Sequence, residues 1–273
     1  MVRDDGYFGK NSMFWRVWRE RVQLLGATRA VLLQIAHPLV AAGVGEHSNF
    51  KQDPLGRLQR TLDTMLTIVF GGKAQAEASL KHLSQVHQPV RGELKRQVGP
   101  FPAHTTYSAN DPVLKLWVHA TLMDTGLLIH QQYIETLNDR QKRQFYEESK
   151  ILAWLMRIPE ELIPPTLEEF NQYFTQQLAS EQIIVSPQAK KMARDILHPS
   201  LVLVPGPLMD LLNSVTSQLL PDRLRQSYGL TWNKRNQMKV KMVKKTIKSL
   251  LPLSPSLVRF MSQYSTLANL KDH

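Results

Sequence analysis

Two histidines in helical sequence patterns are the residues of this chain best suited to bind a cofactor. His87 lies in residues 86–91 (VHQPVR), and His119 lies in the apolar run 117–122 (WVHATL). The 273-residue chain contains no cysteine, so a bound metal or haem would take its protein ligand from an imidazole or a carboxylate. The two histidines are therefore the candidate ligands of a metal or a haem.

A polar stripe on another predicted helix is the second candidate. Asp53 and Pro54 are typical of a helix N-cap and first turn, and the glycines at 71–72 predict its end. Residues three and four apart share a helix face, and here that face carries Arg57, Arg60, Thr61 and Thr64. Turned inward, this face would bind an anion such as a carboxylate; turned outward, it is an ordinary solvated face.

Predicted helices position both histidines. One helix begins near Lys73 and ends before Pro89, which places His87 in the last turn, on the buried side, where the helix dipole favours positive charge. A second helix begins after Asp111 and places His119 on its interior face. A histidine on an apolar stripe can instead be a hydrogen-bonded core residue, so the pattern leaves both readings open.

The chain is helical almost throughout, so we predict an all-α, single-domain, multi-helix bundle spanning residues 1–273. Further helices are expected at 14–35, 138–154, 166 onward, 186–197, 207–220 and 232–251, with a loop at 92–110. His37, before Pro38, is expected to cap a kinked helix. The 42% hydrophobic composition is sufficient for one large core, predicted over about 14–220, and no alternating strand pattern competes.

The net charge of +11 is concentrated late in the chain. In the predicted helix 232–251, apolar residues alternate with the cations Lys234, Arg235, Lys239, Lys241, Lys244, Lys245 and Lys248. Because no nucleic-acid-binding fold accompanies this helix, peripheral contact with an anionic membrane is favoured and nucleic acid is not expected. The alternative is a solvated basic face on a packed helix.

Other function classes lack their motifs. The sequence has no Gly-x-Ser-x-Gly, no phosphate-binding glycine loop and no His-Glu-x-x-His. Its first residues are polar, and no signal-peptide segment is seen, so a cytoplasmic protein with peripheral membrane contact is expected.

Six ordered motifs carry a resemblance to a known family. They are residues 36–48 (AHPLVAAGVGEHS), 53–61 (DPLGRLQRT), 69–71 (VFG), 86–92 (VHQPVRG), 107–112 (YSANDP) and 117–122 (WVHATL). Together they resemble the bacterial family that shares its catalytic domain with the rubber oxygenases (latex-clearing proteins) and the mycophenolic-acid pathway oxygenase MpaB. The resemblance runs from about residue 14 to the last helices.

This resemblance implies a helical bundle around a pocket for haem b, whose iron is bound by a histidine. The family's axial histidine, in a His-x-x-x-Arg arrangement, falls on His87, with Arg91 four residues later. The Arg-x-x-Lys-Thr pattern of the rubber oxygenases falls on Arg57, Arg60 and Thr61. Arg60 replaces the lysine, and a guanidinium that stays protonated cannot coordinate iron.

Two functions remain open after this comparison of motifs. One is a haem-dependent oxygenase that uses dioxygen on a small apolar, isoprenoid-like substrate. In it, Arg57, Arg60 and Thr61 polarise bound oxygen or position the haem carboxylates, and Arg91 is a further anion partner. His119 is the other candidate for contact with the cofactor. The second function is a non-catalytic haem- or lipid-binding helical protein of the same fold.

Overall fold

The computed structural model describes residues 6–47, 54–199 and 205–261, and the side chains of 54–59 lie outside this description. The first half contains α1 (Met13–Trp18), η1 (Arg21–Gly26), α2 (Ala27–Ile35), α3 (Pro38–His47), α4 (Pro54–Phe70), α5 (Lys73–His87), β1 (Arg91–Glu93), β2 (Thr106–Ser108) and α6 (Pro112–Ile129). The second half contains η2 (His130–Ile134), α7 (Asp139–Leu155), η3 (Glu160–Leu162), α8 (Leu167–Ala179), α9 (Pro187–Leu197), α10 (Gly206–Leu219), α11 (Asp222–Ser227), α12 (Lys234–Leu250), η4 (Leu251–Leu253) and α13 (Ser256–Arg259). The all-α fold class is confirmed.

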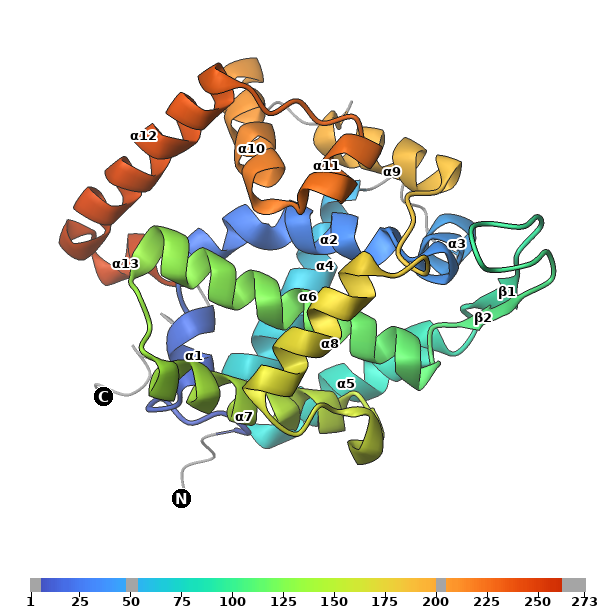
Figure 1. Cartoon of the computed structure of the whole chain (residues 1–273). Coiled ribbons are helices and arrows are strands. Elements are labelled where there is room, and N and C mark those ends of the chain that lie inside the picture. The colour runs from blue at the N-terminus through green and yellow to red at the C-terminus, as the bar shows by residue number, and fades with distance from the viewer. Residues whose placement is uncertain (1–5, 48–53, 200–204, 262–273) are drawn as a thin grey trace.

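The helix α6 runs through the middle of the molecule (Figure 1) and contacts α1, α2, η1 and α7. It starts as predicted, because the Asp111 side chain accepts hydrogen bonds from the backbone N–H groups of Val113 and Leu114. Large side chains such as Trp117 and Met123 are buried along it. A helix surrounded by other helices is apolar on most of its faces, which explains the long apolar run in this part of the sequence.

Side-chain caps start three later helices. Asn138 caps α7, and Ser186 caps α9, each with its side-chain oxygen on a backbone N–H of the first turn. Thr166 and Glu169 form a capping box at the start of α8. The starts of all three helices, and the ends of α7 and α9, match the sequence prediction within a residue or two.

The prediction of one helix over 14–35 was wrong. The chain instead forms α1, the 3₁₀ turns of η1, and α2. The buried amide of Gln23 donates hydrogen bonds to the carbonyls of Val17 and Gly126, 3.1 Å each. Gly26 packs so closely on α6 that a Cβ there would lie 2.5 Å from the Thr125 methyl group. These tertiary contacts override the helical periodicity.

The predicted loop 92–110 contains a short antiparallel hairpin. Strand β1 pairs with β2 in the register Arg91–Ser108, Gly92–Tyr107 and Glu93–Thr106. Strands of three residues are too short to show an alternating pattern, which explains why no strand is predicted in this loop. The hairpin projects at the edge of the molecule beside α3 (Figure 1), where Tyr107 packs with Leu39 and Leu94.

The cap predicted at His37 is confirmed. Its Nδ1 accepts a hydrogen bond, 3.3 Å long, from the backbone N–H of Leu39 in the first turn of α3. Across this cap, the segment Arg21–Ile35 and the helix Pro38–His47 meet at a bend of 105°. Within the described ranges, no single helix is long and apolar enough to cross a membrane. The two segments on either side of this bend reach the required length and hydropathy only when they are taken together.

The C-terminal segment returns to the start of the chain. The backbone N–H of Met261 donates to the carbonyl of Arg19, 2.8 Å, and Phe260 forms a bridge with Glu20. The guanidinium of Arg259 binds the Glu20 carboxylate with both Nε and Nη2, at 2.9 and 2.8 Å. Glu20 is only 1% exposed, so this ion pair, here called the Glu20–Arg259 clasp, is buried on its acidic side.

The predicted basic helix is α12, which lies at the outer edge of the molecule (Figure 1). Val240 is buried and, with Val243 and Ile247, packs on a core cluster that includes Tyr133. Lys244 points inward, because its Nζ donates to Gln132 and lies 5.3 Å from the centre of the Tyr133 ring. The apolar stripe predicted for this helix is therefore divided between a packed face and an exposed face.

Candidate functional site

The imidazole of His87 borders a cavity of about 500 Å³, here called the His87 cavity. As predicted, His87 is in the last turn of α5, but its side chain is half-buried rather than buried. The other walls come from the start of α6 and the end of α7. Its apolar lining is Leu80, Leu83, Leu155 and Met156.

Positive charge dominates the polar lining of this cavity. The lining includes the cations Lys81, Lys115 and Arg157 against one carboxylate, Glu77, which accepts a 2.8 Å hydrogen bond from Tyr7. Burial lowers the pKa of Lys115, and the nearby charge of Arg157 lowers it further. Neither Lys115 nor Arg157 forms an ion pair with another described residue. The cavity can therefore accept an anionic group.

Arg157 has an unusual backbone conformation at the end of α7. Its φ is +58°, in the left-handed region that glycine usually occupies. The N–H of Arg157 donates to the Trp154 carbonyl and that of Ile158 to the Ala153 carbonyl, at 2.8 and 3.0 Å. These two bonds are those of a Schellman motif, in which glycine is the common residue at the Arg157 position.

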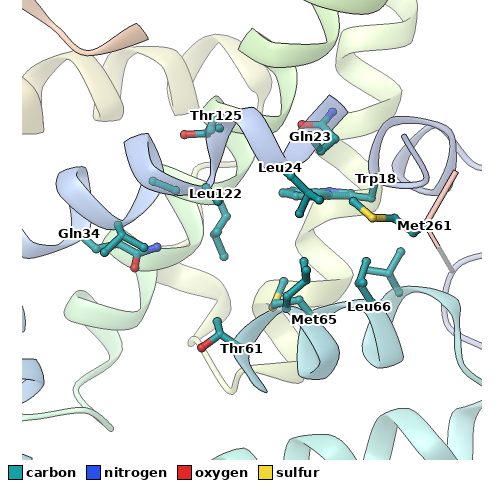
Figure 2. Close-up of a pocket in the computed structure, with 16 residues that line it drawn as sticks. Trp18, Gln23, Leu24, Gln34, Thr61, Met65, Leu66, Leu122, Thr125 and Met261 are labelled. Carbon is teal, nitrogen blue, oxygen red and sulfur yellow. The ribbon is translucent and has the colours of Figure 1, made fainter. Parts of the chain in front are cut away.

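A second cavity, of about 110 Å³, lies between α2, α4 and α6 (Figure 2) and is here called the apolar chamber. Thr61 and Gln34 lie on one side of it, and Trp18 and Met261 lie on the other (Figure 2). The lining is Trp18, Gln23, Leu24, Gly26, Ala27, Ala30, Val31, Gln34, Thr61, Leu62, Met65, Leu66, Val69, Leu122, Thr125 and Met261. An apolar ligand fits such a lining better than a charged one.

The structure does not gather the predicted site residues into one place. Thr61 lines the apolar chamber, whereas His87 lines the other cavity. Arg60 is exposed on α4, and Arg91 is exposed on β1. The side chain of Arg57 lies outside the described residues. The assignment of these residues to a site stays a prediction.

His119 is an interior residue, as its pattern predicted, and it lines neither of these two cavities. Its Nε2 is 3.0 Å from the carbonyl oxygen of Ser149, so the neutral ring donates this hydrogen bond. Its Nδ1 has no hydrogen-bond partner among the described residues. Burial lowers the pKa of His119 to about 4, which keeps the ring neutral at pH 7.

Stability is expected to fall as the pH decreases from 6.5 to 4. Burial lowers the pKa of His37 as well as that of His119 to about 4, against 6.5 for an ordinary histidine, and nearby Asp111 opposes the shift at His37. Because the unfolded chain takes up these protons first, each histidine destabilises the fold by about 1.4 kcal/mol per pH unit in this window. The effect disappears above pH 6.5.

The measurement is the urea midpoint of unfolding between pH 7.5 and 4.5. Carboxylates also titrate near the acidic end, so His119→Gln is the matched comparison, and its stability should decline less steeply than that of the parent. Parallel pH profiles for the two proteins would contradict the shift at His119.

Lys115 and Arg157 are the site residues that sequence reasoning missed. Lys115 is a cation in the strongly apolar helix α6, and that interruption was the available signal. Arg157 follows a helix end that carries no glycine, which gave no sign of a special role. Lys115 and Arg157 are far from His87 in the sequence, so the sequence alone could not show that they line the same cavity.

Within the described residues, no three His, Asp or Glu side chains come together as a metal site. A haem needs only one protein ligand, because its porphyrin already supplies four nitrogens. One imidazole beside apolar walls and the cations Lys115 and Arg157 therefore suits a porphyrin carrying carboxylates. The residues present at the His87 cavity fit the group that the family resemblance implies.

Comparison with known proteins identifies the family. The chain belongs to the family described as ER-bound oxygenase mpaB/B′/rubber oxygenase, catalytic domain, whose model matches residues 15–248. The chain is also similar to uncharacterised proteins from Mycobacterium bovis and Mycobacterium tuberculosis. Each is 27% identical over 216 residues, covering 76% of this chain and 80% of the relative. No solved structure matches the chain.

Proposed function

We propose that this protein is a haem-dependent oxygenase that uses dioxygen on a small apolar substrate, with His87 as the iron ligand. Membership of an oxygenase family supports the reaction class. The observation that carries the cofactor assignment is the His87 cavity, in which an imidazole, apolar side chains and the cations Lys115 and Arg157 line about 500 Å³. When bound, haem supplies redox-active iron for the reaction with dioxygen.

The two cavities have different roles in this proposal. The imidazole of His87 holds the cofactor, and the side chains Leu80, Leu83 and Leu155 exclude water from its faces. The apolar chamber receives an apolar part of the substrate, and Thr61 places one hydroxyl at its wall. Desolvation by this lining binds an isoprenoid-like chain in preference to a polar molecule.

Absorption spectroscopy and oxygen uptake test the proposal. The purified protein, supplied with haem, should develop a Soret band at one haem per chain, and it should consume oxygen when an isoprenoid is added. A protein that binds haem but consumes no oxygen with any apolar substrate would be the non-catalytic alternative. The absence of any haem binding would refute the proposal.

We also propose that α12 and the residues after it dock on an anionic membrane. The helix contains no acidic residue, and its cations Lys234, Arg235, Lys241, Lys245 and Lys248 are exposed. Large apolar side chains on α12 and in the segment that follows it are exposed too: Met238 (69%), Met242 (68%), Leu250, Leu253 (81%), Leu257 and Val258. Cations beside exposed apolar side chains match the surface of a bilayer that contains anionic lipid.

Vesicle sedimentation is expected to show this docking. Binding should require anionic lipid and weaken with salt, and replacing Lys241, Lys245 and Lys248 with Gln should lower it on the order of a hundredfold, at about 1 kcal/mol per lysine. Lys244 is left unchanged because it packs inward. The control is the equally charged triple Lys190→Gln, Lys191→Gln, Arg194→Gln on α9, whose side chains are exposed.

Two results would overturn the docking proposal. One is equal vesicle binding by the two triple variants, which would assign the effect to net charge alone. The other is tight retention by RNA with none by vesicles.

A further inference from the structure

The cations of the His87 cavity call for an explanation beyond a ligand for iron. Lys115 is half-buried, and the positive charge of Arg157 lowers its pKa, so the two like charges lie close enough to repel each other. Bringing such charges together without a partner is unfavourable. Lys115 is half-buried and Arg157 is exposed, and both line the same cavity as the imidazole.

The backbone conformation of Arg157 is a second observation that indicates a role for its side chain. A glycine would adopt its φ of +58° without strain, whereas an arginine adopts it at a cost in free energy. The Schellman motif of α7 would form equally well with glycine there. The helix end therefore gains nothing from arginine at this position, and the side chain borders the cavity.

We propose that Lys115 and Arg157 together form a carboxylate-binding site in the His87 cavity, which anchors the two propionate groups of a porphyrin. Guanidinium and ammonium groups bind carboxylates through charge-assisted hydrogen bonds. The apolar part of the lining, which includes Leu80 and Leu83, suits the rest of the ring. The identity of the ligand rests on the proposed function, but the carboxylate chemistry of the site does not depend on iron.

Iron-free protoporphyrin IX is the probe, and its binding is followed by quenching of tryptophan fluorescence. Lys115→Gln and Arg157→Gln should each lower its affinity about tenfold to a hundredfold, the effect of losing a charge-assisted hydrogen bond. Arg157→Lys should keep most of the affinity. Protoporphyrin dimethyl ester, which lacks the carboxylates, should bind the parent and both Gln variants equally.

Arg157→Gly gives a readout that a purely structural role would not produce. Glycine relieves the left-handed strain, so the thermal midpoint should rise by about 2–4 °C, while protoporphyrin affinity falls as for Arg157→Gln. Arg140→Gln, an exposed change at the other end of α7, is the control and should alter neither quantity.

The outcomes separate this site from the role of His87. Protoporphyrin has no iron, so its binding through Lys115 and Arg157 does not depend on iron ligation by His87. The Lys115 and Arg157 variants could lose affinity for protoporphyrin while His87 proves not to bind haem iron. That combination would support the carboxylate-binding site and refute the proposed function. Unchanged affinity for protoporphyrin in both Gln variants would overturn the inference.

Discussion

His87→Ala is expected to abolish the Soret band of the haem-loaded protein while leaving the helical circular dichroism signal unchanged. The imidazole is half-buried at the end of α5 and is the only histidine that lines the His87 cavity among the described residues. Losing the axial ligand removes the one protein bond to iron. Because the residue ends its helix and packs only partly, alanine there should cost little stability.

Two histidines serve as controls for this result. His82→Ala, on the same helix and exposed, should keep both the Soret band and the fold. His119→Ala should instead lower the free energy of unfolding, since it removes a buried ring that donates to the Ser149 carbonyl. Haem retained by His87→Ala and lost in a folded His119→Ala protein would assign ligation to His119 and refute our proposal.

Arg259→Ala is expected to lower the free energy of unfolding by about 3–5 kcal/mol. The Glu20 carboxylate is 1% exposed, and without the guanidinium its charge would stay buried without its principal partner, while the Nε of Arg19 lies 3.9 Å away. The chain can then protonate the acid or open the structure around it, and either response costs stability. Urea unfolding at pH 7 measures the loss.

An exposed ion pair provides the comparison. Arg143 binds Glu168 at 2.9 Å with both side chains exposed, so Arg143→Ala should cost about 1 kcal/mol or less. Adding Glu20→Gln to Arg259→Ala should recover part of the loss, because it removes the buried charge. Equal effects of Arg259→Ala and Arg143→Ala would show that the clasp contributes no more than a surface pair.

The parts of the fold that could be predicted from the sequence are mostly helix starts, which depend on residues close together in the chain. Side-chain caps such as Asp111 and Thr166 act within one turn, so the sequence locates their helices without knowledge of the tertiary structure. The break after α1 depends on Gln23 reaching Gly126 on α6, a contact between segments far apart in the chain. Periodicity in 14–35 could not reveal it.

The candidate site was predictable only where local pattern and motif agreed. Both placed His87 in the last turn of its helix, and the structure places it there beside a cavity. The polar stripe on α4 could not be assigned from the sequence. Helical spacing shows which residues share a face, but it does not show whether that face contacts a cavity or the solvent. Thr61 meets the apolar chamber, whereas Lys115 and Arg157 join His87 through packing of three separate helices.

The Glu20–Arg259 clasp also constrains when the chain can complete its fold. Glu20 and Arg259 are 239 residues apart, so during synthesis the carboxylate remains without its guanidinium until nearly all the described chain has been made. A nascent N-terminal segment that buried Glu20 earlier would bury an unpaired charge. Contacts of such long sequence separation also slow folding, since they close the largest loop last. Met261, which follows the clasp and lines the apolar chamber, therefore closes that chamber only once the chain has been made as far as residue 261.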